Sequence, residues 1–481
     1  MRFRNHKIII IIALLILSKL GFSQQDNTLF FLHDIPESNF VNPAVQIRCR
    51  EYYGLPLLTT LHLNVNSTGF SYNSFSPGAS EIDVDKVVSK MHKWDYVSAE
   101  VHYTPLSFGF MYDKKQYFNF AWTEKVETKV FFPKELFLLA KDGNTQYVGD
   151  GLSTRNPGVK AVYYREFSFG YSTTYGRYAT VGGHAKVLFG LAGVFTKRRP
   201  IDLSTQRNTY NIDASWNPKI NTSLPLNIGY NNQGYVNDVS IGSISPVSFL
   251  LNFKNQGLAT DLGFIYKKDK ITWSGSILDI GLIWWHDQTN KFENKGHFSF
   301  QGATVTDGMN SEDYVNSLRD SIENQFRFKV TKKGFITFLN PRIYFGGTYP
   351  IHKQVKVGAL IRTELYPGRP IFGLTLSANA FSKKGSSVSV NYSVMNGSFA
   401  NLGVGFGIGG DHSQFFILSD NVLAFFMPQS ARNANIRFGF NFFIGCTEKK
   451  KTYKFPKGSD CGCNWAPETP KNTEALKGLK K

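Results

Sequence analysis

Beyond its first 25 residues the chain has no run of about 20 apolar residues, the length that a membrane-spanning helix needs. That absence argues against a multi-helix membrane protein. Cysteine is also scarce, since a chain of 481 residues carries four, which are too few for a disulfide scaffold of this size. Neither an HExxH zinc motif nor a GxSxG nucleophile motif occurs, and the ten histidines form no recognisable catalytic set. We therefore expect no enzyme activity, no metal and no cofactor.

The first residues predict an export signal. Three basic residues precede the apolar run "IIIIIALLIL" at 8–17, and small residues at 21 and 23 precede a cleavage site before Gln24. We interpret residues 1–23 as a signal peptide that is removed. The alternative is an uncleaved membrane anchor, which the short apolar run and its interruption by Lys19 disfavour.

The net charge of +18 would fit a nucleic-acid-binding protein, but an exported protein rarely meets nucleic acid. The charge is spread along the chain, apart from a concentration of lysines after residue 447. Anionic lipid headgroups or an acidic protein surface are therefore the expected partners, and nucleic acid is not.

Aromatic residues and glycine are abundant, with 42 Phe, 23 Tyr and 43 Gly, and they follow a pattern of strict alternation. In "ANIRFGFNFFIG" (434–445), one face would carry Ile436, Phe438, Phe440, Phe442 and Ile444, and the other Arg437, Gly439 and Asn441. The same pattern recurs at 106–112, 166–172, 260–266, 387–395 and 401–409. Alternation of this kind indicates strands with a different environment on each side.

These segments predict an all-β fold, a transmembrane antiparallel β-barrel of about 14 strands with a few short loop helices. Turn-like sequences separate the segments at 112–117, 266–270, 349–354 and 381–386. The predicted strands begin near residues 56, 97, 116, 160, 180, 208, 258, 271, 341, 355, 371, 387, 401 and 434. A further segment at 413–420 could displace the weak one at 208. Helices are predicted at 84–97, 132–144 and 311–326. A soluble all-β exported protein is the alternative.

Polar residues on the face opposite the aromatic side chains are candidates to line the barrel lumen. They are His62, His184, Lys356, Arg362, Glu364, Arg437 and Asn441. For the two histidines, a hydrogen-bonded lumen side chain is favoured over an acid or base. Arg362 and Glu364 could set selectivity, but we favour a pair that stiffens the wall, because alternated charges are costly toward lipid.

The end of the chain reads as a basic, poorly packed tail at 446–481. Its "DCGCNW" motif holds Cys461 and Cys463, and Cys446 lies close in sequence. A disulfide among these three cysteines, or inert thiols, is favoured over a soft-metal site. The tail is also the segment that we expect to bind a periplasmic protein.

Several motifs resemble an uncharacterised family of outer-membrane β-barrels from Bacteroidota, a domain of unknown function. The motifs are "NPA" at 42–44, "GLATDLGFIY" at 257–266, "SGSILDIGLIWW" at 274–285, "NYSVMNGSFANLGVGFGIG" at 391–409 and the stretch 418–445. The family is distantly similar to FadL-type transporters of hydrophobic compounds and to barrels associated with type IX secretion. The resemblance implies a FadL-like barrel at 51–445 whose lumen is partly filled by residues 24–50. Asn42, Pro43 and Ala44 are then candidate plug residues.

The function that follows is passive uptake or binding of small hydrophobic molecules across the outer membrane. The alternative is a structural or assembly component of a secretion or surface machine. A barrel enzyme that acts on lipids is a weaker third hypothesis. An apolar, continuous lumen would favour transport, whereas a closed lumen would favour the structural role.

Overall fold

The computed structural model describes residues 26–446 except 70–83, 93, 143–146, 155–156, 198, 209–210, 244, 295, 301–327, 367–368, 383–384, 396–397 and 429. The predicted signal peptide, the predicted helix at 311–326 and the tail after Cys446 lie outside these residues. None of the described helices is long and apolar enough to cross a bilayer.

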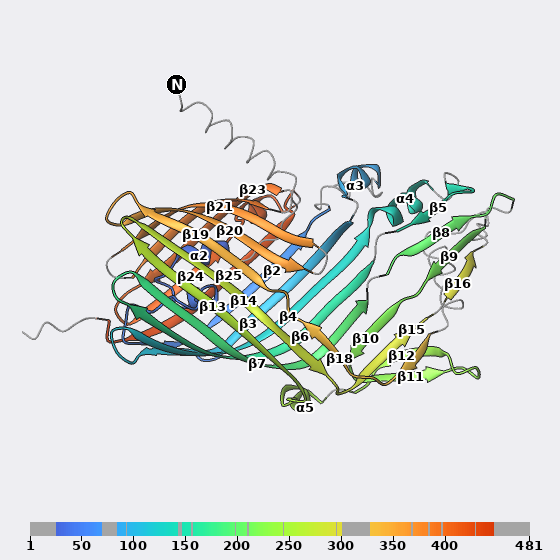
Figure 1. The fold of residues 1–481 in the computed structure, drawn as a ribbon, viewed down its shortest axis with the longest axis horizontal. Helices are drawn as coiled ribbons and strands as arrows, with labels where there is room; N and C mark the ends of the chain where they lie inside the picture. The colour runs from blue at the N-terminus through green and yellow to red at the C-terminus, as the bar shows by residue number, and fades with distance from the viewer. Residues whose placement is uncertain are drawn as a thin grey trace, which may run out of the picture. The chain divides into compact units, whose positions relative to one another are not determined.

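Fourteen antiparallel strands close into one barrel wall within the described residues (Figure 1). The first wall strand is interrupted and consists of β1 (Glu51–Gly54) and β2 (Thr60–Ser67). The wall continues with β3 (Trp94–Met111), β4 (Gln116–Pro133), β6 (Gly158–Tyr175), β7 (Ala179–Lys197), β13 (Asn255–Lys268), β14 (Ile271–Trp285), β18 (Phe335–Phe338) with β19 (Arg342–Pro350), β20 (Val355–Tyr366), β21 (Arg369–Phe381), β22 (Ser387–Met395), β23 (Ser398–Gly409), β24 (Ser413–Ser419) and β25 (Asn433–Ile444). Because β25 pairs with β1 and β2 as well as with β24, the wall has no free edge at this point.

Side chains alternate between the lumen and the outside along each wall strand. On β25, Arg437 and Asn441 are buried, whereas Phe442 and Ile444 are 41% and 53% exposed. The outward residues are apolar on the other strands too, for example Leu262 on β13 and Ile361 on β20. The wall therefore presents an apolar exterior and a polar interior, as the sequence pattern predicts.

The two ends of the barrel differ in the length of their connections. The turns at 112–115, 269–270 and 351–354 are short and lie at one end, together with the register partners Glu51 and Ile444. The longest connections, which follow β2, β4, β7 and β14, are at the other end. Short turns are typical of the periplasmic side of outer-membrane barrels, and long loops of the outside. We refer to these as the short-turn end and the long-loop end.

The long connections carry further strands and the loop helices. Three further strands join the wall at the long-loop end. β10 (Lys219–Ser223) pairs with the last residues of β7, β15 (Thr289–Glu293) pairs with β10, and β17 (Lys329–Thr331) pairs with β15. Separate from them are the hairpin of β11 (Leu226–Tyr230) and β12 (Val236–Ile241) and a sheet of β5 (Gly151–Ser153), β8 (Ile201–Thr205), β9 (Ile212–Trp216) and β16 (Gly296–Phe300). The loop helices are α3 (Val84–Lys90), α4 (Lys134–Asp142), α5 (Pro246–Leu250) and α7 (Leu423–Phe426).

Two of the sequence predictions need correction here. The weak candidate near residue 208 is not a wall strand, because the strands on either side of it, β8 and β9, pair with each other in the outlying sheet. The segment at 413–420 takes its place as β24. The helix predicted at 84–97 ends at Lys90, and the residues from Trp94 onward belong to β3. The helix predicted at 132–144 is α4, which begins directly after Pro133.

Replacing Phe440 by lysine tests the outward direction of the apolar face of β25. A charge on the lipid side is expected to reduce the free energy of folding into a bilayer, by roughly 2–4 kcal/mol if the site lies at mid-depth. The measurement is folding into lipid vesicles, followed by the shift in gel mobility between unheated and heated samples. Phe440→Leu serves as the matched control and should fold normally. Equal folding of both variants would contradict the assignment of this face.

Candidate functional site

The barrel lumen is filled from the short-turn end by residues 26–49, which we call the plug. It contains the helix α2 (Asn27–Phe31) and the 3-10 helix η1 (Pro36–Phe40). The apolar plug residues pack against lumen-facing wall residues in one buried cluster: Leu29, Phe30, Phe31, Leu32, Ile35 and Val41 from the plug, with Leu278, Tyr344, Leu360, Phe416 and Leu418 from the wall. Burial of each large side chain contributes roughly 1.5–3 kcal/mol, so the plug is held first by its apolar face.

Charged and polar contacts fix one side of the plug to the strands near the closure of the barrel. The Arg437 guanidinium binds both carboxylate oxygens of Asp26, at 2.9 and 3.0 Å. The backbone N–H and the hydroxyl of Thr28 donate to Asp420, at 2.8 and 2.5 Å. Because these groups are buried, their hydrogen bonds are needed to offset the loss of water.

On the same side, Asn441 of β25 donates a 2.8 Å hydrogen bond to Glu37 of η1. Together with Arg437, this explains the polar face of the stretch 434–445. The two polar residues that the sequence placed toward the lumen hold the plug.

The opposite side of the plug rests on a pair of glycines. Asn42, Pro43 and Ala44 form a tight turn in which the Ala44 N–H donates to Asn42 Oδ1 at 3.0 Å. Gly182 of β7 and Gly263 of β13 are register partners, and a Cβ atom on either would overlap this turn. The "NPA" motif therefore fits the wall only where two neighbouring strands both lack a side chain.

His184 joins the plug to the wall on this side. Its Nε2 lies 2.7 Å from Asn39 Oδ1 of the plug, and its Nδ1 lies 2.9 Å from Asp261 Oδ2 of β13. Further along, the Ser276 hydroxyl donates to the Val41 carbonyl at 2.5 Å. The plug is thus held from both sides of the lumen.

A disulfide between Cys49 and Cys446 fixes the end of the plug to the residues that follow β25. The prediction that Cys446 pairs within the tail is therefore wrong. The two cysteines are 397 residues apart in sequence and meet because the barrel closes. A crosslink across so long a loop removes much conformational freedom from the unfolded chain. Cys461 and Cys463 lie outside the described residues, and their state stays a prediction.

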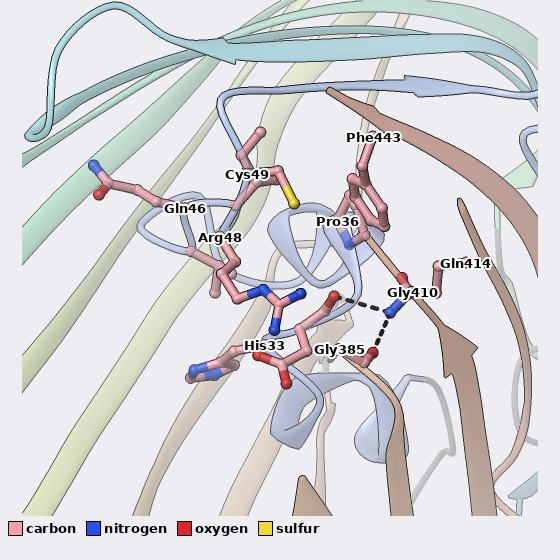
Figure 2. A pocket seen from close by; sticks show the side chains of 12 residues that line it. His33, Pro36, Gln46, Arg48, Cys49, Gly385, Gly410, Gln414 and Phe443 are labelled. Atoms are coloured by element: carbon pink, nitrogen blue, oxygen red, sulfur yellow. Dashed lines mark hydrogen bonds between the residues drawn. The ribbon is translucent and has the colours of Figure 1, made fainter. Parts of the chain in front are cut away.

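A pocket beside this disulfide opens at the short-turn end (Figure 2). Its empty volume of about 360 Å³ includes open solvent. His33 and Arg48 line it from the plug, and Gln414 lines it from β24. The Gln414 amide donates to the carbonyls of Asp34 and Gly385, at 3.2 and 2.9 Å, so this polar side chain is already engaged in holding the plug.

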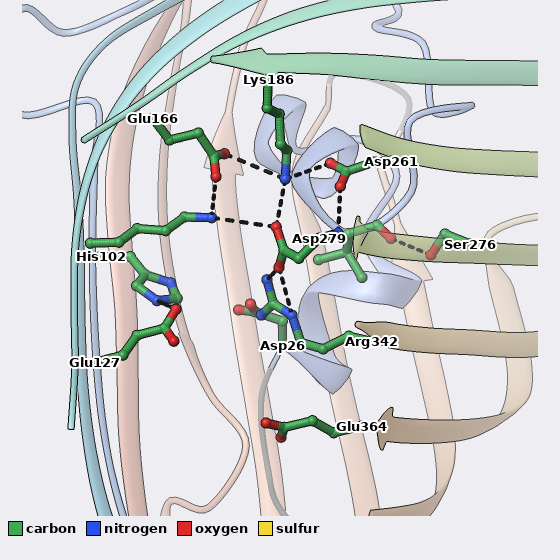
Figure 3. Close-up of polar contacts among 12 residues, drawn as sticks. Asp26, His102, Glu127, Glu166, Lys186, Asp261, Ser276, Asp279, Arg342 and Glu364 are labelled. Carbon is green, nitrogen blue, oxygen red and sulfur yellow. Dashed lines mark hydrogen bonds and ion pairs between the residues drawn. The ribbon is translucent and has the colours of Figure 1, made fainter. Parts of the chain in front are cut away.

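Beyond the plug, a layer of buried ion pairs crosses the lumen (Figure 3). The Lys186 ammonium lies 2.7 Å from Asp261, 2.8 Å from Asp279 and 3.4 Å from Glu166. Lys125 of β4 lies 2.7 Å from the other oxygen of Glu166. Each of these residues is at most 6% exposed. Removing one member of such a group leaves an uncompensated charge, which typically costs about 3–5 kcal/mol.

A bulge in the wall supplies one member of this layer. The pairing of β13 with β14 shifts register after Thr260, and Asp279 has a left-handed backbone with φ of 58°. As a result Leu278 and Asp279 are both buried on the lumen side, and the Asp279 N–H donates to Asp261 at 2.7 Å. Arg342 of β19 donates from two nitrogens to the Asp279 carboxylate. The strained position thus places a carboxylate between cations.

The remaining lumen candidates lie at different depths. Glu364 pairs with Lys129 at 2.6 Å and more distantly with Arg362 at 3.4 Å, so the predicted pair exists but is not the shortest contact. The His62 ring is buried with its Nδ1 3.9 Å from Asp26. Lys356 is exposed near the short-turn end, with its ammonium 4.9 Å from the centre of the Phe381 ring.

An apolar cluster lies between the ion pairs and the long-loop end. It is formed by lumen-facing residues of β6, β7, β13 and β14: Val162, Tyr164, Leu188, Ala259, Ile283 and Trp285. Phe195, Phe335 and Leu339 pack against it. The lumen is therefore occupied in layers by the plug, by ion pairs and by apolar side chains. Among the described residues, no group of three His, Cys, Asp or Glu side chains is arranged to hold a metal ion.

The pKa values of the two plug carboxylates shift in opposite directions. Burial raises the pKa of Glu37 to about 7, although the hydrogen bond from Asn441 opposes the rise. Burial also acts against the charged form of Asp26, but Arg437 and, more weakly, His62 hold its pKa well below the usual range. Asp26 is therefore the charged anchor of the plug, and Glu37 is a group that titrates near neutral pH.

The lumen contacts that the sequence analysis missed come from strands far apart in the chain. On β4, Lys125, Glu127 and Lys129 alternate with Val126 and Thr128, which is the signal that could have marked them. The bulge at Asp279 gives no such signal, because it breaks the alternation.

A protein-family model described as "Family of unknown function (DUF5723)" matches residues 43–420. No curated protein matches the chain. Among solved structures, a Pseudomonas aeruginosa FadL homologue is 8% identical with a TM-score of 0.40, covering 89% of this chain and 100% of that chain. The Ralstonia pickettii toluene transporter TbuX is 8% identical with a TM-score of 0.39, covering 85% and 92%. The Pseudomonas putida toluene transporter TodX is 8% identical with a TM-score of 0.34, covering 88% and 95%.

The glycine pair beneath the plug gives a sharp test of its packing. Gly182→Ala should displace the 42–44 turn and destabilise the docked plug by about 1–3 kcal/mol, the usual cost of overpacking. The measurement is cleavage of the N-terminal segment by added protease, with mass spectrometry of the product. Gly410→Ala is the matched control, since a Cβ there has open space around it. Identical cleavage of the two variants would argue against the close fit.

Glu37 predicts a pH dependence of the docked plug. Because its pKa is raised by burial to about 7, from an ordinary value of about 4.3, the docked plug is stabilised fully below about pH 4. That contribution, roughly 3–4 kcal/mol at most, is lost as the pH rises through about 7. In Glu37→Gln, the thermal unfolding midpoint should therefore change less between pH 5 and pH 8 than in the wild type. At pH 8 the midpoint of the variant should be the higher of the two. An unchanged slope in this variant would assign the pH dependence to other groups.

Proposed function

The chain belongs to the DUF5723 family, whose function is unknown, and we propose that this member is a closed, non-enzymatic outer-membrane barrel with a structural or assembly role. In this role the barrel holds its long surface connections outside the cell and its plug and tail on the periplasmic side. A secretion or surface machine is the kind of assembly that such a part would serve.

One observation carries the proposal, the covalent and two-sided fixation of the plug. The plug is joined by the Cys49–Cys446 disulfide, by the Asp26–Arg437 pair and by the turn against Gly182. A gate that opens freely would not need a covalent tie to the closing strand. The ion-pair layer supports the same conclusion, since moving an apolar molecule through it would separate buried charges.

The outer membrane is the setting that the wall supports. Strands that satisfy every backbone group between neighbours are one of the two ways to cross a bilayer, and the apolar exterior matches lipid. The first and last residues of the wall, Glu51 and Ile444, lie at the short-turn end. In bacterial barrels this end faces the periplasm. The basic tail at 446–481 would then lie in the periplasm, where we propose that it binds a protein partner.

Uptake of small hydrophobic molecules is the second candidate. The observation in its favour is the apolar lumen cluster around Trp285, which faces inward from four neighbouring strands. For this function the plug would have to leave, and the pairs around Lys186 would have to rearrange. The two candidates therefore differ in whether the intact protein passes anything at all.

Reconstitution of the intact protein decides between them. We expect wild-type protein in planar bilayers to give no ion conductance, and proteoliposomes to take up toluene and a fluorescent fatty acid no faster than empty vesicles. A variant lacking residues 26–45 shows whether the wall alone conducts, and Gly182→Ala serves if that variant does not fold. Uptake by the wild type above the empty-vesicle rate would replace the structural proposal by the transport one. The structural proposal also predicts that the wild-type protein, purified in mild detergent, retains a periplasmic protein. A variant that ends at Cys446 keeps the disulfide and should lose that partner.

A further inference from the structure

The outer wall carries an ion pair on the side that should face lipid. Glu124 of β4 and Arg165 of β6 are register partners, with Arg165 Nε 2.5 Å from Glu124 Oε1. Their chain neighbours Lys125 and Glu166 point into the lumen, where they pair with each other, so Glu124 and Arg165 point outward. A charge on the lipid side of a barrel wall is destabilising, and this pair therefore needs a cover.

Aromatic side chains provide that cover. Arg165 lies between two rings, with its guanidinium 5.3 Å from the centres of both Trp122 and Phe253. The Trp122 indole N–H donates to Glu124 at 2.7 Å. As a result Arg165 is only 3% exposed although it is on the outer wall. Trp122 belongs to the wall itself, but Phe253 does not.

Phe253 belongs to the segment Ser245–Lys254, which leaves the long-loop end and returns along the outer wall to β13. Its contacts with the wall are aromatic: the Phe249 ring lies 5.6 Å from Tyr163, and the Phe253 ring lies 5.0 Å from Phe189 in an edge-to-face arrangement. Lys254 ties its end to Asp287 at 3.2 Å. We call residues 245–254 the outer segment; it includes α5.

The outer segment presents apolar side chains away from the wall. Val247 and Leu251 are each 66% exposed, and Phe253 is 41% exposed. This surface continues into the lipid-facing face of β13, where Leu258 is 67% exposed and Leu262 is 56% exposed. An apolar surface continuous with the lipid-facing wall matches acyl chains better than it matches water.

We propose that the outer segment lies in the bilayer, at the leaflet on the long-loop end, and shields the Glu124–Arg165 pair from lipid. The partner of this surface is the hydrocarbon of that leaflet near its headgroups. The connection between β7 and β13 thus anchors the long-loop end to the membrane before it reaches the outlying strands. This inference rests on the proposed membrane setting of the barrel.

Spin-label accessibility tests the location. Single nitroxides are placed at Leu251, at Leu262 on the wall and at Gln233 in the exposed β11–β12 hairpin, in a Cys461→Ser, Cys463→Ser background that keeps the native disulfide. In lipid vesicles, the labels at 251 and 262 should collide more often with oxygen than with a water-soluble nickel complex, and the label at 233 the reverse. Water accessibility at 251 alone would overturn this inference. Water accessibility at both 251 and 262 would instead overturn the membrane barrel.

A mutant cycle tests the shielding. Phe253→Ala should lower the folding equilibrium constant in lipid vesicles roughly tenfold or more, because it exposes buried charges to lipid. In a Glu124→Leu, Arg165→Leu background the same substitution should cost little, since no charge remains to shield. Equal loss in both backgrounds would overturn the shielding role and leave Phe253 as a packing residue.

Discussion

The hydrogen bonds between the last strand and the first are the constraint on which the rest of the molecule depends. In a bilayer, a strand edge without a partner would leave a row of N–H and C=O groups unsatisfied, and each would cost several kcal/mol. β25 removes this edge by pairing with β1, β2 and β24. Once the wall is closed, each strand has an inside and an outside, and the alternation of residues becomes a division between lumen and lipid.

Closure also brings together what holds the plug. Cys49 precedes the first wall strand and Cys446 follows the last, and they meet because Glu51 and Ile444 are register partners. Arg437 and Asn441 lie on the closing strand and bind Asp26 and Glu37 of the plug. The plug is therefore part of the closure rather than an addition to it. Its removal would leave a buried arginine without its carboxylate, which makes a simple hinge motion costly.

Local sequence pattern was sufficient to predict the wall but not its contents. Alternation gave the outward residues of β25 and the lumen side of His62, His184 and Arg362, because the period of two is a property of each strand alone. It failed near residue 208, because short polar strands alternate in the same way whether they join a wall or an outlying sheet.

Contacts between distant strands depend on the register around the whole barrel, and no local pattern encodes them. Glu364 was expected to pair with Arg362, two residues away, but its shortest partner is Lys129 on β4. For Cys446 the sequence suggests a disulfide within the tail or an inert thiol, because Cys49 is close to it only after closure. The bulge at Asp279 cannot be predicted from alternation, because a bulge interrupts the alternation. The same interruption turns the Asp279 carboxylate into the lumen.

The inside and the outside of this wall solve the same electrostatic problem in different ways. In the lumen, buried charges such as Lys186 and Asp279 are compensated by other charges at hydrogen-bonding distance. On the exterior, a single pair is compensated and then covered by aromatic rings from a returning loop. In both places a buried charge is kept where an apolar side chain would have a lower free energy of burial. The charges in the lumen fix the plug and fill the pore, and the charges outside fix the position of a loop against the wall. Both arrangements favour a rigid barrel over a channel that must change shape to pass a molecule.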